Sequence, residues 1–390
     1  MKQYDYIIAG AGAAGLSLLR EFINHPAGLD DKKILVVDRA LSDPPDKTWC
    51  FWEAGSFALP ELIHHSWKDL EVRFGKRTLS LSPEKYSYHC VRSREYHAHI
   101  LEQAQNAPSV TLLDASIQEI RPHEERPVLV TDEGSYEASW IFQSCFIPSA
   151  SPENGAHTPL KQHFLGWEIH LKRPLLDPGM ATFMDFDVTQ QEDGLSFMYV
   201  LPFTPVRALV EYTVFGRNLL EQPAYEEEIR TFLSNRFALK SSDYQIKRRE
   251  FGWVPMSDQR FRGWYGDRVL NTGLAGGTAK PSTGYSFIRA HQHARQIVRR
   301  LANNKAPQPF KSAYRYRIYD LQLLHLLYHK PKLSLRIFEE LFRNNPIDRL
   351  LAFLGEESTP LQDLAVMNSV PYTPFLKALN QIRGRVLSGR

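Results

Sequence analysis

The sequence contains few cysteines, little net charge and no long apolar run, and each shortage excludes a class of protein. Three cysteines at wide spacing (Cys50, Cys90 and Cys145) do not suggest a disulfide framework, and a reducing cytosol fits them better. A formal net charge of +3 gives no indication of nucleic-acid binding. No apolar run approaches the roughly 18 residues of a membrane span. The start, "MKQYDYIIAG", lacks a signal-peptide pattern, and no Cys/His spacing indicates a metal site.

The N-terminal segment predicts a dinucleotide-binding unit. A strand (4–9) and a helix (about 13–22) are joined by Gly10-Ala11-Gly12-Ala13-Ala14-Gly15, a complete G-x-G-x-x-G. The three glycines permit a tight turn, close approach of a pyrophosphate, and close packing of helix on strand, while the helix N-terminus favours phosphate. A second strand, "KILVVDRA", ends at Asp38 with Arg39 beside it. Asp38 lies about 20 residues after the glycine motif, at the position where an acid binds a ribose hydroxyl in such units. An acid at this position favours FAD or NAD over NADP.

A second glycine-rich segment repeats the order strand, loop and helix. We expect the strand at about 269–272 and a long helix that Ser282, Thr283 and Gly284 open, with a hydroxyl of the first two as the cap. In flavoproteins of the hydroxylase type, such a helix points its N-terminus at the flavin pyrimidine. Those proteins usually carry Gly-Asp at the strand end, where this chain has Gly273-Leu274, so either the ribityl contact differs or the site is specialised. The further cofactor residues predicted here are Gly273, Gly276, Lys280, Thr283 and Gly284.

Seven short blocks resemble those of the bacterial lycopene β-cyclases, flavoproteins that close the ends of linear carotenoids into rings. They follow the family's order over about three quarters of the chain: "DKTWCFW" (46–52), "QHFLGWEI" (162–169), "FMDFDV" (183–188), "FMYVLPF" (197–203), "LVEYTVF" (209–215), "EFGWVPM" (250–256) and "GLAGGTAKPSTGYSF" (273–287). The resemblance implies an α/β fold with a Rossmann-type FAD-binding domain of the hydroxylase kind. It further implies an interleaved, mainly antiparallel β-sheet substrate domain.

The predicted layout divides the chain into three parts. The FAD-binding domain uses residues 1–50, 88–155 and 256–305, and the substrate domain uses 51–87 and 156–255, where β-like runs predominate. Residues 306–390 form a helical C-terminal region, because apolar residues recur there at helical spacing. Its composition favours packing on the other two parts, and its basic flanks also suit a membrane surface.

The middle of the chain is rich in aromatic residues. A polyene has no polar atom, so its site needs an apolar, aromatic tunnel, and aromatic faces also stabilise a cation. An ordinary aromatic core is the competing interpretation for each residue taken singly. The predicted pocket residues are Trp49, Phe51, Trp52, Trp167, Phe183, Tyr199 and Tyr212.

Cyclisation of this kind is acid–base chemistry, so the predicted catalytic residues are carboxylic acids. Glu211 falls on the first acidic position of the family's Leu-(hydrophobic)-Glu-acid-Thr block and is our candidate proton donor, which requires burial and a raised pKa. A solvated glutamate on an edge strand is the alternative. Tyr212 occupies the second acidic position. Asp185 and Glu168 also have apolar neighbours, and either could accept the ring proton or hold its strand in place.

The resemblance also implies the cofactors and partners. Reduced FAD would stabilise the cation, with NAD(P)H as the external reductant, and Arg92 and Lys280 would contact the flavin. The substrate would be lycopene or a related linear carotene, taken from a membrane by a protein peripheral to the inner face of the cytoplasmic membrane. Two rivals share the fold: a flavin-dependent prenyl reductase or hydroxylase, and a prenyl-binding protein without chemistry.

Overall fold

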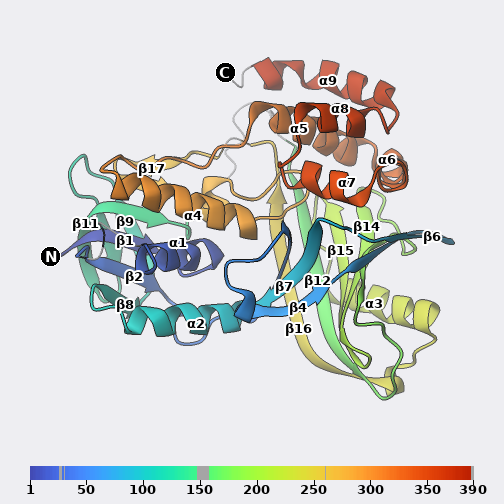
Figure 1. Ribbon diagram of the computed structural model, residues 1–390, viewed down its shortest axis with the longest axis horizontal. Helices are drawn as coiled ribbons and strands as arrows, with labels where there is room; N and C mark the ends of the chain where they lie inside the picture. Colours follow the sequence, from blue (N-terminus) through green and yellow to red (C-terminus); the bar gives the residue numbers. More distant parts are fainter. Residues whose placement is uncertain (26–28, 30, 147–157, 260, 388–390) are drawn as a thin grey trace.

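The computed structural model describes residues 1–25, 29, 31–146, 158–259 and 261–387. Figure 1 shows two sheets side by side, with the C-terminal helices lying over the second sheet. This is the mixed α/β architecture that the sequence predicts. The predicted boundary between residues 155 and 156 lies outside the described residues, and the division into domains stays a prediction.

The first sheet carries the N-terminal glycine-rich turn. Its strands run in the order β17 (Trp264–Gly266), β18 (Val269–Asn271), β11 (Gly134–Gln143), β1 (Lys2–Ala9), β2 (Ile34–Asp38) and β8 (Val110–Asp114), and β9 (Ile117–Arg121) and β10 (Val128–Thr131) extend it from β11. Strand β1 is parallel to both β11 and β2. Ile7 and Ile8 are buried on opposite faces of this sheet, which is why β1 reads as an unbroken apolar run.

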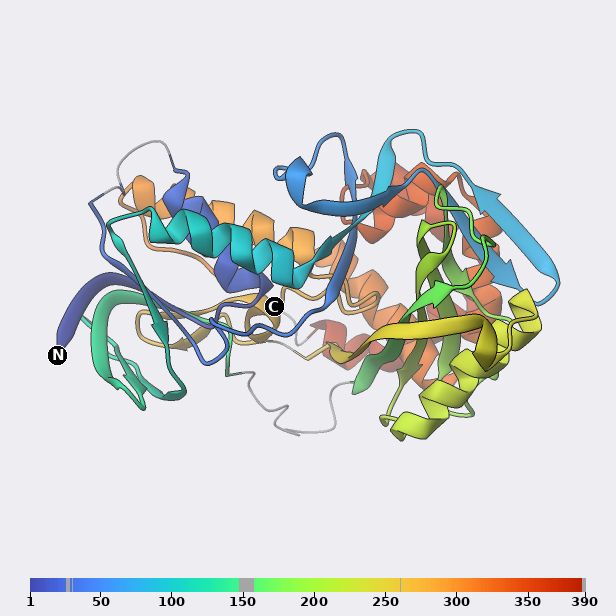
Figure 2. The same ribbon diagram turned by 90° about the horizontal axis from the view of Figure 1, so that it is seen from below.

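Three helices cover one face of the first sheet. Helix α1 (Ala13–Ile23) contacts both α2 (Ser93–Gln105) and α4 (Phe287–Ala302), and Figure 2 shows the three together. Leu16, Ile100 and Ile297 come from the three helices and share one buried cluster with Ile8. The helices therefore hold the glycine-rich turn, at the start of α1, against a fixed sheet edge.

The late helix begins further along the chain than the sequence predicts. Its start was expected at Ser282 to Gly284, whereas α4 begins at Phe287 and residues Gly273–Gly276 form a short 3-10 turn, η4. Gly284 has a φ of +74°, a left-handed conformation that a right-handed helix does not contain. The Ser282 hydroxyl does not cap the helix and instead donates a hydrogen bond to Asp320.

The second sheet is mainly antiparallel, as predicted. Its strands run in the order β16 (Tyr244–Met256), β12 (Leu160–Leu171), β15 (Arg207–Gly216), β14 (Leu195–Thr204), β13 (Met180–Asp185), β5 (Asp69–Phe74) and β6 (Arg77–Leu81), and only β13 and β5 pair in parallel among the pairs described. A smaller sheet, β3 (Thr48–Ala54), β7 (Tyr86–Arg92) and β4 (Ile63–Trp67), stands beside it, with the 3-10 turns η1 (Pro60–Leu62) and η3 (Ser241–Asp243) in the connections.

The two faces of the second sheet are covered by different parts of the chain. Helix α3 (Gln222–Phe237) packs on one face, against Val210, Tyr212 and Val214. The other face, with Leu209 and Phe215, packs against the C-terminal helices. These are α5 (Tyr314–His329), α6 (Pro331–Asn344), α7 (Ile347–Leu354), α8 (Pro360–Met367) and α9 (Tyr372–Leu387). Strand alternation along β15 thus sends neighbouring side chains to separate environments.

Candidate active site

The N-terminal turn has the geometry that a pyrophosphate needs. Gly10 adopts a φ of +104°, which favours glycine. A Cβ on Gly15 would lie 1.9 Å from the carbonyl oxygen of Gly10, so only glycine allows α1 to pack this closely. A Cβ on Gly12 would meet no protein atom within 4 Å, and Gly12 is exposed. The turn is therefore closed on the protein side and open on the side where a phosphate would approach the start of α1.

The other predicted residues of this unit lie around the same turn. Asp38 ends β2, and its Oδ2 accepts a hydrogen bond from the Ala11 amide at 2.6 Å. Ala13 and Ala14 form the first residues of α1, where amide groups have no partner within the helix. Arg39 is exposed next to Asp38. Together these groups suit the phosphate and ribose portions of a dinucleotide.

The second glycine-rich segment packs against the first. Gly273 has a φ of +57°, and a Cβ there would lie 2.9 Å from the Cβ of Ala14. A Cβ on Gly276 would approach the Asn271 carbonyl oxygen to 2.4 Å, and one on Gly284 would reach Oε1 of Gln162 on β12. Glycines thus let the loop between β18 and α4 run from the dinucleotide turn to the second sheet.

A cavity of about 150 Å³ lies where this loop meets the second sheet. Two of its buried polar atoms, Oε1 of Gln162 and Oγ1 of Thr283, have no hydrogen-bond partner among the described residues. Unpartnered buried polar atoms are uncommon and indicate a missing partner. The cavity is lined by Thr48, Trp49, Cys50, Tyr88, Gln162, Phe164, Tyr199, Leu201, Leu209, Glu211, Glu250, Val254, Thr283, Gly284, Tyr285, Ser286 and Phe287. A polar heterocycle such as a flavin ring fits this combination of aromatic walls and free polar atoms.

Glu211 lies in the wall of this cavity and not on an edge strand. Its strand, β15, runs between β12 and β14. Thr213 donates a hydrogen bond to Oε1 of Glu211 at 3.0 Å. Burial, followed by the charge of Glu250, raises the pKa of Glu211 well above its usual value, against smaller opposing effects of Thr213 and Arg248. These surroundings therefore favour the protonated form of the carboxyl, which is the form that can donate a proton.

Glu250 is a second carboxylate in the same cavity. Gly166 of β12 pairs with Glu211 of β15 on one side and with Glu250 of β16 on the other. Glu250 accepts hydrogen bonds from the amide of Thr48 at 3.0 Å and from a guanidinium nitrogen of Arg248 at 2.6 Å. Two glutamates thus face one cavity from either side of a glycine.

Glu168 is held in an arginine cluster outside this cavity. Its carboxylate contacts Arg92 at 2.9 Å, Arg207 at 2.7 Å and Arg248 at 3.2 Å. Burial alone would raise the pKa of Glu168, but the hydrogen bonds and charges of Arg207 and Arg92 outweigh it and lower the pKa to about 2. Three arginines therefore hold Glu168 as an ionised carboxylate. Arg92, predicted to contact the flavin, contacts Glu168 and Asp46 in this structure, and its contact with the flavin stays a prediction.

Asp185 lies away from Glu211. It pairs with Met198, whose side chain belongs to the cluster under α3, and its carboxylate faces Arg73 at 3.2 Å and Arg236 at 3.9 Å. Burial raises the pKa of Asp185 to about 6, although a backbone hydrogen bond and the two arginines oppose the shift. The structure does not bring Asp185 to the cavity of Glu211.

Tyr212 and Trp167 also lie on the α3 face. Both belong to the cluster around α3, and the Tyr212 hydroxyl donates to the Thr189 carbonyl oxygen at 3.1 Å. Tyr212 therefore points away from Glu211 and does not supply a second polar group beside it. Two of the other predicted pocket residues lie nearer the first sheet: the Trp49 ring stands 5.4 Å from the Phe287 ring at the small cavity, and Phe51 packs among the helices of that sheet.

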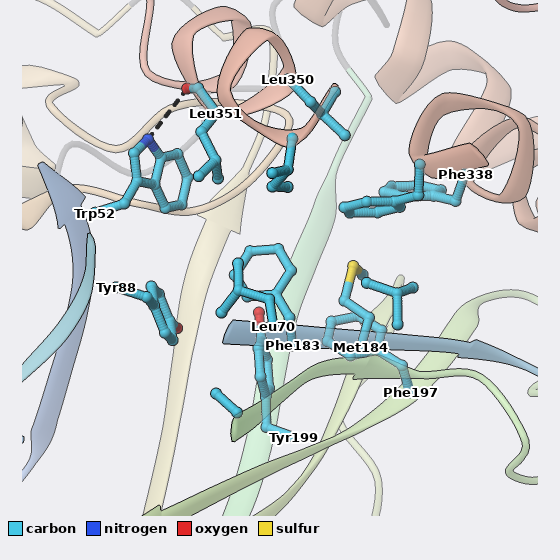
Figure 3. Close-up of a cluster of buried hydrophobic side chains, with 14 of the residues drawn as sticks. Trp52, Leu70, Tyr88, Phe183, Met184, Phe197, Tyr199, Phe338, Leu350 and Leu351 are labelled. Atoms are coloured by element: carbon cyan, nitrogen blue, oxygen red, sulfur yellow. Dashed lines mark hydrogen bonds between the residues drawn. The ribbon is translucent and has the colours of Figure 1, made fainter. Parts of the chain in front are cut away.

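A larger apolar cavity of about 390 Å³ separates the second sheet from the C-terminal helices. Figure 3 shows side chains from the sheet, among them Phe183 and Tyr199, opposite residues of the C-terminal helices, with Trp52 hydrogen-bonded to the Leu351 carbonyl oxygen. Tyr199, Thr283 and Tyr285 line both cavities. The small cavity with Glu211 thus adjoins an extended apolar space.

Lys280 contributes to the wall of the large cavity and contacts the C-terminal region. Its ammonium lies 2.8 Å from Asp320 of α5 and 3.2 Å from Glu356. Arg289 of α4 also contacts Glu356, at 2.7 Å. This buried cluster joins the loop after β18 to the C-terminal helices, whereas the sequence placed Lys280 at the flavin.

Comparison with known proteins decides the family. The profile described as "Lycopene cyclase protein" matches residues 5–380. The chain belongs to the lycopene cyclase family. Lycopene beta-cyclase of Pantoea ananas is 28% identical to it over 302 residues, which span 73% of this chain and 71% of the relative. Lycopene beta-cyclase of Paracoccus sp. is 27% identical over 328 residues, 80% and 77% of the two chains. The family predicted from the seven sequence blocks, and with it the prediction of a cyclase enzyme, is confirmed.

Solved structures confirm the predicted fold of this lycopene cyclase family member. A geranylgeranyl bacteriochlorophyll reductase-like protein from Thermoplasma acidophilum has a TM-score of 0.60 at 14% identity and covers 100% of this chain and 98% of its own. A flavoprotein/dehydrogenase from Cytophaga hutchinsonii has a TM-score of 0.61 at 13% identity, with 100% of both chains covered. A halogenase PltM variant in complex with FAD has a TM-score of 0.57 at 12% identity, over 98% and 97% of the two chains.

Sequence reasoning missed Glu250, as well as Gln162, Tyr88 and Tyr285, among the residues that line the small cavity. Glu250 stands first in the block "EFGWVPM", but its neighbours along the chain give no sign of a shared site with Glu211, 39 positions earlier. Only the pairing of β12 with both β15 and β16 brings the two together. A signal was present in "LGWEI", because a glycine within a strand often marks a close approach of neighbouring groups.

Proposed function

We propose that this chain is a lycopene β-cyclase, which isomerises the linear ψ-ends of lycopene to the β-rings of γ-carotene and β-carotene without net redox change. The observation that carries the proposal is the position of Glu211, an acid with a raised pKa, where the polar small cavity adjoins the apolar large one. A polyene occupying the large cavity would present its end to this acid.

Glu211 is the proposed proton donor. Protonation of the terminal double bond generates a tertiary cation, which the neighbouring alkene attacks to close a six-membered ring, and loss of a ring proton then gives the β-ring. An alkene is a weak base, so the donor must be desolvated and protonated at neutral pH. Burial of Glu211 supplies both conditions, and Thr213 fixes the orientation of its carboxyl.

Aromatic residues around Glu211 would stabilise the cation. Tyr88, Tyr199 and Tyr285 border the cavity, and the hydroxyls of Tyr88 and Tyr285 lie 3.2 Å apart. Burial raises the pKa of all three tyrosines, so they remain neutral and their rings can face a positive charge. The apolar walls also exclude water, which would otherwise quench the cation.

FAD is the cofactor that the residues fit. Gly10, Gly12 and Gly15 would hold its pyrophosphate at the start of α1 and Asp38 its ribose, while Gln162 and Thr283 offer free polar atoms to a flavin ring. When bound in its reduced form, FAD supplies negative charge that stabilises a cation nearby. NAD(P)H is the proposed external reductant.

The route of the substrate points to a membrane surface. Among the described residues, no helix is long and apolar enough to cross a bilayer. Leu361, Leu364, Tyr372 and Leu376 on α8 and α9 are nevertheless exposed, and the last three also line the large apolar cavity. An apolar surface at the mouth of an apolar cavity suits entry of a carotene from lipid. We therefore propose peripheral binding to the inner face of the cytoplasmic membrane through α8 and α9.

The assay that tests the function supplies lycopene in liposomes to the anaerobic protein with reduced FAD. Products with the mass of lycopene and the absorption of ring-bearing carotenes are expected. Products two mass units heavier would identify a flavin-dependent prenyl reductase instead, and stoichiometric consumption of NAD(P)H would accompany them. Carotene binding without any product would favour a prenyl-binding protein of the same fold.

A further inference from the structure

The two carboxylates of the small cavity lie across one glycine. A Cβ on Gly166 would stand 3.4 Å from Oε2 of Glu211 and 3.3 Å from Cγ of Glu250, and 3.0 Å from Cδ1 of Leu209. Side chains directly opposite one another on adjacent strands point to the same face of a sheet. Gly166 therefore leaves the space above the middle strand open, so that both glutamates reach one small volume.

The two glutamates have different partners. Glu211 accepts a hydrogen bond from Thr213, a neutral hydroxyl. Glu250 is paired with the Arg248 guanidinium at 2.6 Å and accepts hydrogen bonds from both the amide and the hydroxyl of Thr48. A carboxyl with neutral surroundings retains its proton, whereas one paired with a cation gives it up. Two carboxyl groups in such contrasting surroundings are suited to opposite roles, one as acid and one as base.

We propose that Glu250 is the catalytic base of this cyclase, which accepts the ring proton after Glu211 has protonated the polyene. The inference rests on the proposed function. The Glu211 proton forms the new C–H bond, and the electron pair of the neighbouring alkene forms the ring C–C bond. When the ring C–H bond breaks, its electron pair forms the ring double bond and the released proton passes to the Glu250 carboxylate. Proton transfer from Glu250 to Glu211 across Gly166 restores the starting state, so no proton or electron is consumed.

The other groups at the cavity do not compete for this role. Burial raises the pKa of the Cys50 thiol and of the Tyr88, Tyr199 and Tyr285 hydroxyls, so none of these cavity groups is a base at neutral pH, and Arg248, which pairs with Glu250, is a cation. Glu168 does not line the cavity and is ion-paired with three arginines, and Asp185 lies on the opposite face of the sheet. Among the described residues that line the cavity, Glu250 is thus the carboxylate available to accept a proton beside Glu211.

The experiment compares Glu250→Gln with the wild-type enzyme, both loaded with reduced FAD, in single-turnover ring formation across pH. Glutamine can still accept hydrogen bonds from Thr48 but cannot take a proton. We expect ring formation to fall by about 100-fold or more, the usual effect of losing an acid–base group. A catalytic carboxylate base makes the wild-type rate decline at low pH, and this acid limb should be absent in Glu250→Gln.

Glu168→Gln is the matched control, because it removes a second carboxylate from Arg248 without changing a residue that lines the cavity. Its acid limb should match that of the wild type even where the variant is less stable. If Glu250→Gln does not retain FAD, Glu250→Asp is measured in its place. Glu250→Asp that binds FAD, forms rings more slowly and keeps the acid limb supports Glu250 as the base. An unchanged rate of ring formation in Glu250→Asp contradicts that role. If the wild type forms rings and Glu250→Gln keeps both the rate and the acid limb, the role of Glu250 is refuted and the proposed function is not. A wild type that forms no ring at any pH refutes the proposed function.

Discussion

The Lys280 ammonium lies 2.8 Å from the Asp320 carboxylate, and both side chains are buried between the loop after β18 and helix α5. Glu356 contributes a second carboxylate, shared with Arg289. The pair therefore joins the segment that borders the small cavity to the C-terminal helices that enclose the large one. A charge pair in this position holds two parts of the site in register.

Replacement of Asp320 should destabilise the protein, because the Lys280 charge would lose its nearest partner while still buried. We expect Asp320→Asn to lower the free energy of unfolding by about 3 kcal/mol, the lower end for breaking a buried pair, since Glu356 remains. Urea unfolding measures the change. Asp31→Asn is the control, because Asp31 is 81% exposed and contacts Lys32 only at 3.8 Å, so it should change stability by less than about 0.5 kcal/mol. Equal effects of the two variants would contradict the role of the pair.

Removal of the Glu211 proton should abolish ring formation without releasing the cofactor. Glu211→Gln keeps the shape of the side chain but has no acidic proton, so we expect ring formation to drop by at least about 100-fold. Flavin fluorescence should show FAD bound as in the wild type, since Glu211 is on the second sheet and the dinucleotide turn is on the first. Glu227→Gln, an exposed change on α3, should leave the rate unaltered. Full activity in Glu211→Gln would remove this residue from the mechanism.

Because its pKa is raised in the folded protein, Glu211 should make the stability of the protein depend on pH. In the folded protein Glu211 keeps its proton above pH 4.5, the pKa expected of an unfolded glutamate, so the folded state binds more protons there than the unfolded state. This group's contribution to stability is therefore full below that pH and is lost as pH rises towards the raised folded pKa, at up to about 1.4 kcal/mol per pH unit.

Comparison of Glu211→Gln with the wild type isolates this contribution. The variant should gain stability relative to the wild type as the pH is raised from 5 to 8, because glutamine does not titrate. Unfolding midpoints in urea across that pH range measure the difference. A stability difference that does not vary with pH would show that Glu211 is ionised in the folded protein.

Two glycines of the N-terminal turn should respond differently to the same change. Gly15→Ala would place a Cβ 1.9 Å from the Gly10 carbonyl oxygen, so we expect a loss of about 3 kcal/mol or more and little folded protein. Gly12→Ala meets no protein atom within 4 Å and should fold normally. It should nevertheless weaken FAD binding, because its methyl group enters the space where a pyrophosphate approaches. Thermal unfolding and flavin titration separate the two effects, and undiminished FAD affinity in Gly12→Ala would argue against this site.

The exposed apolar surface of α8 and α9 should control binding to lipid. Leu361 is 80% exposed and does not line the large cavity, so Leu361→Glu should weaken liposome binding about tenfold by removing one buried leucine. Flotation with anionic liposomes measures the effect. Leu219→Glu is the control, because Leu219 is 41% exposed on the segment between β15 and α3 and belongs to neither α8 nor α9. Loss of binding in both variants alike would place the contact elsewhere.

The sequence by itself determined the features that depend on local backbone demands. Gly10, Gly12 and Gly15 specify the tight turn and close packing at their own positions, and the recurrence of apolar residues predicts the helices after residue 310. The ordered blocks predicted the family that the comparisons confirm. The start of the late helix was placed too early, because Gly284 adopts a left-handed conformation that a helix-forming pattern does not reveal.

Tertiary structure decided which charged groups meet. Glu211 and Tyr212 are neighbours in sequence but face opposite sides of β15, whereas Glu211 and Glu250 belong to separate strands and share a cavity across Gly166. Lys280 likewise contacts a carboxylate 40 positions later in the chain. Strand register and helix docking set these contacts, and both result from the packing of distant segments. A local sequence motif thus specifies where a dinucleotide can bind, whereas long-range pairing of strands determines which carboxylates lie together in the site.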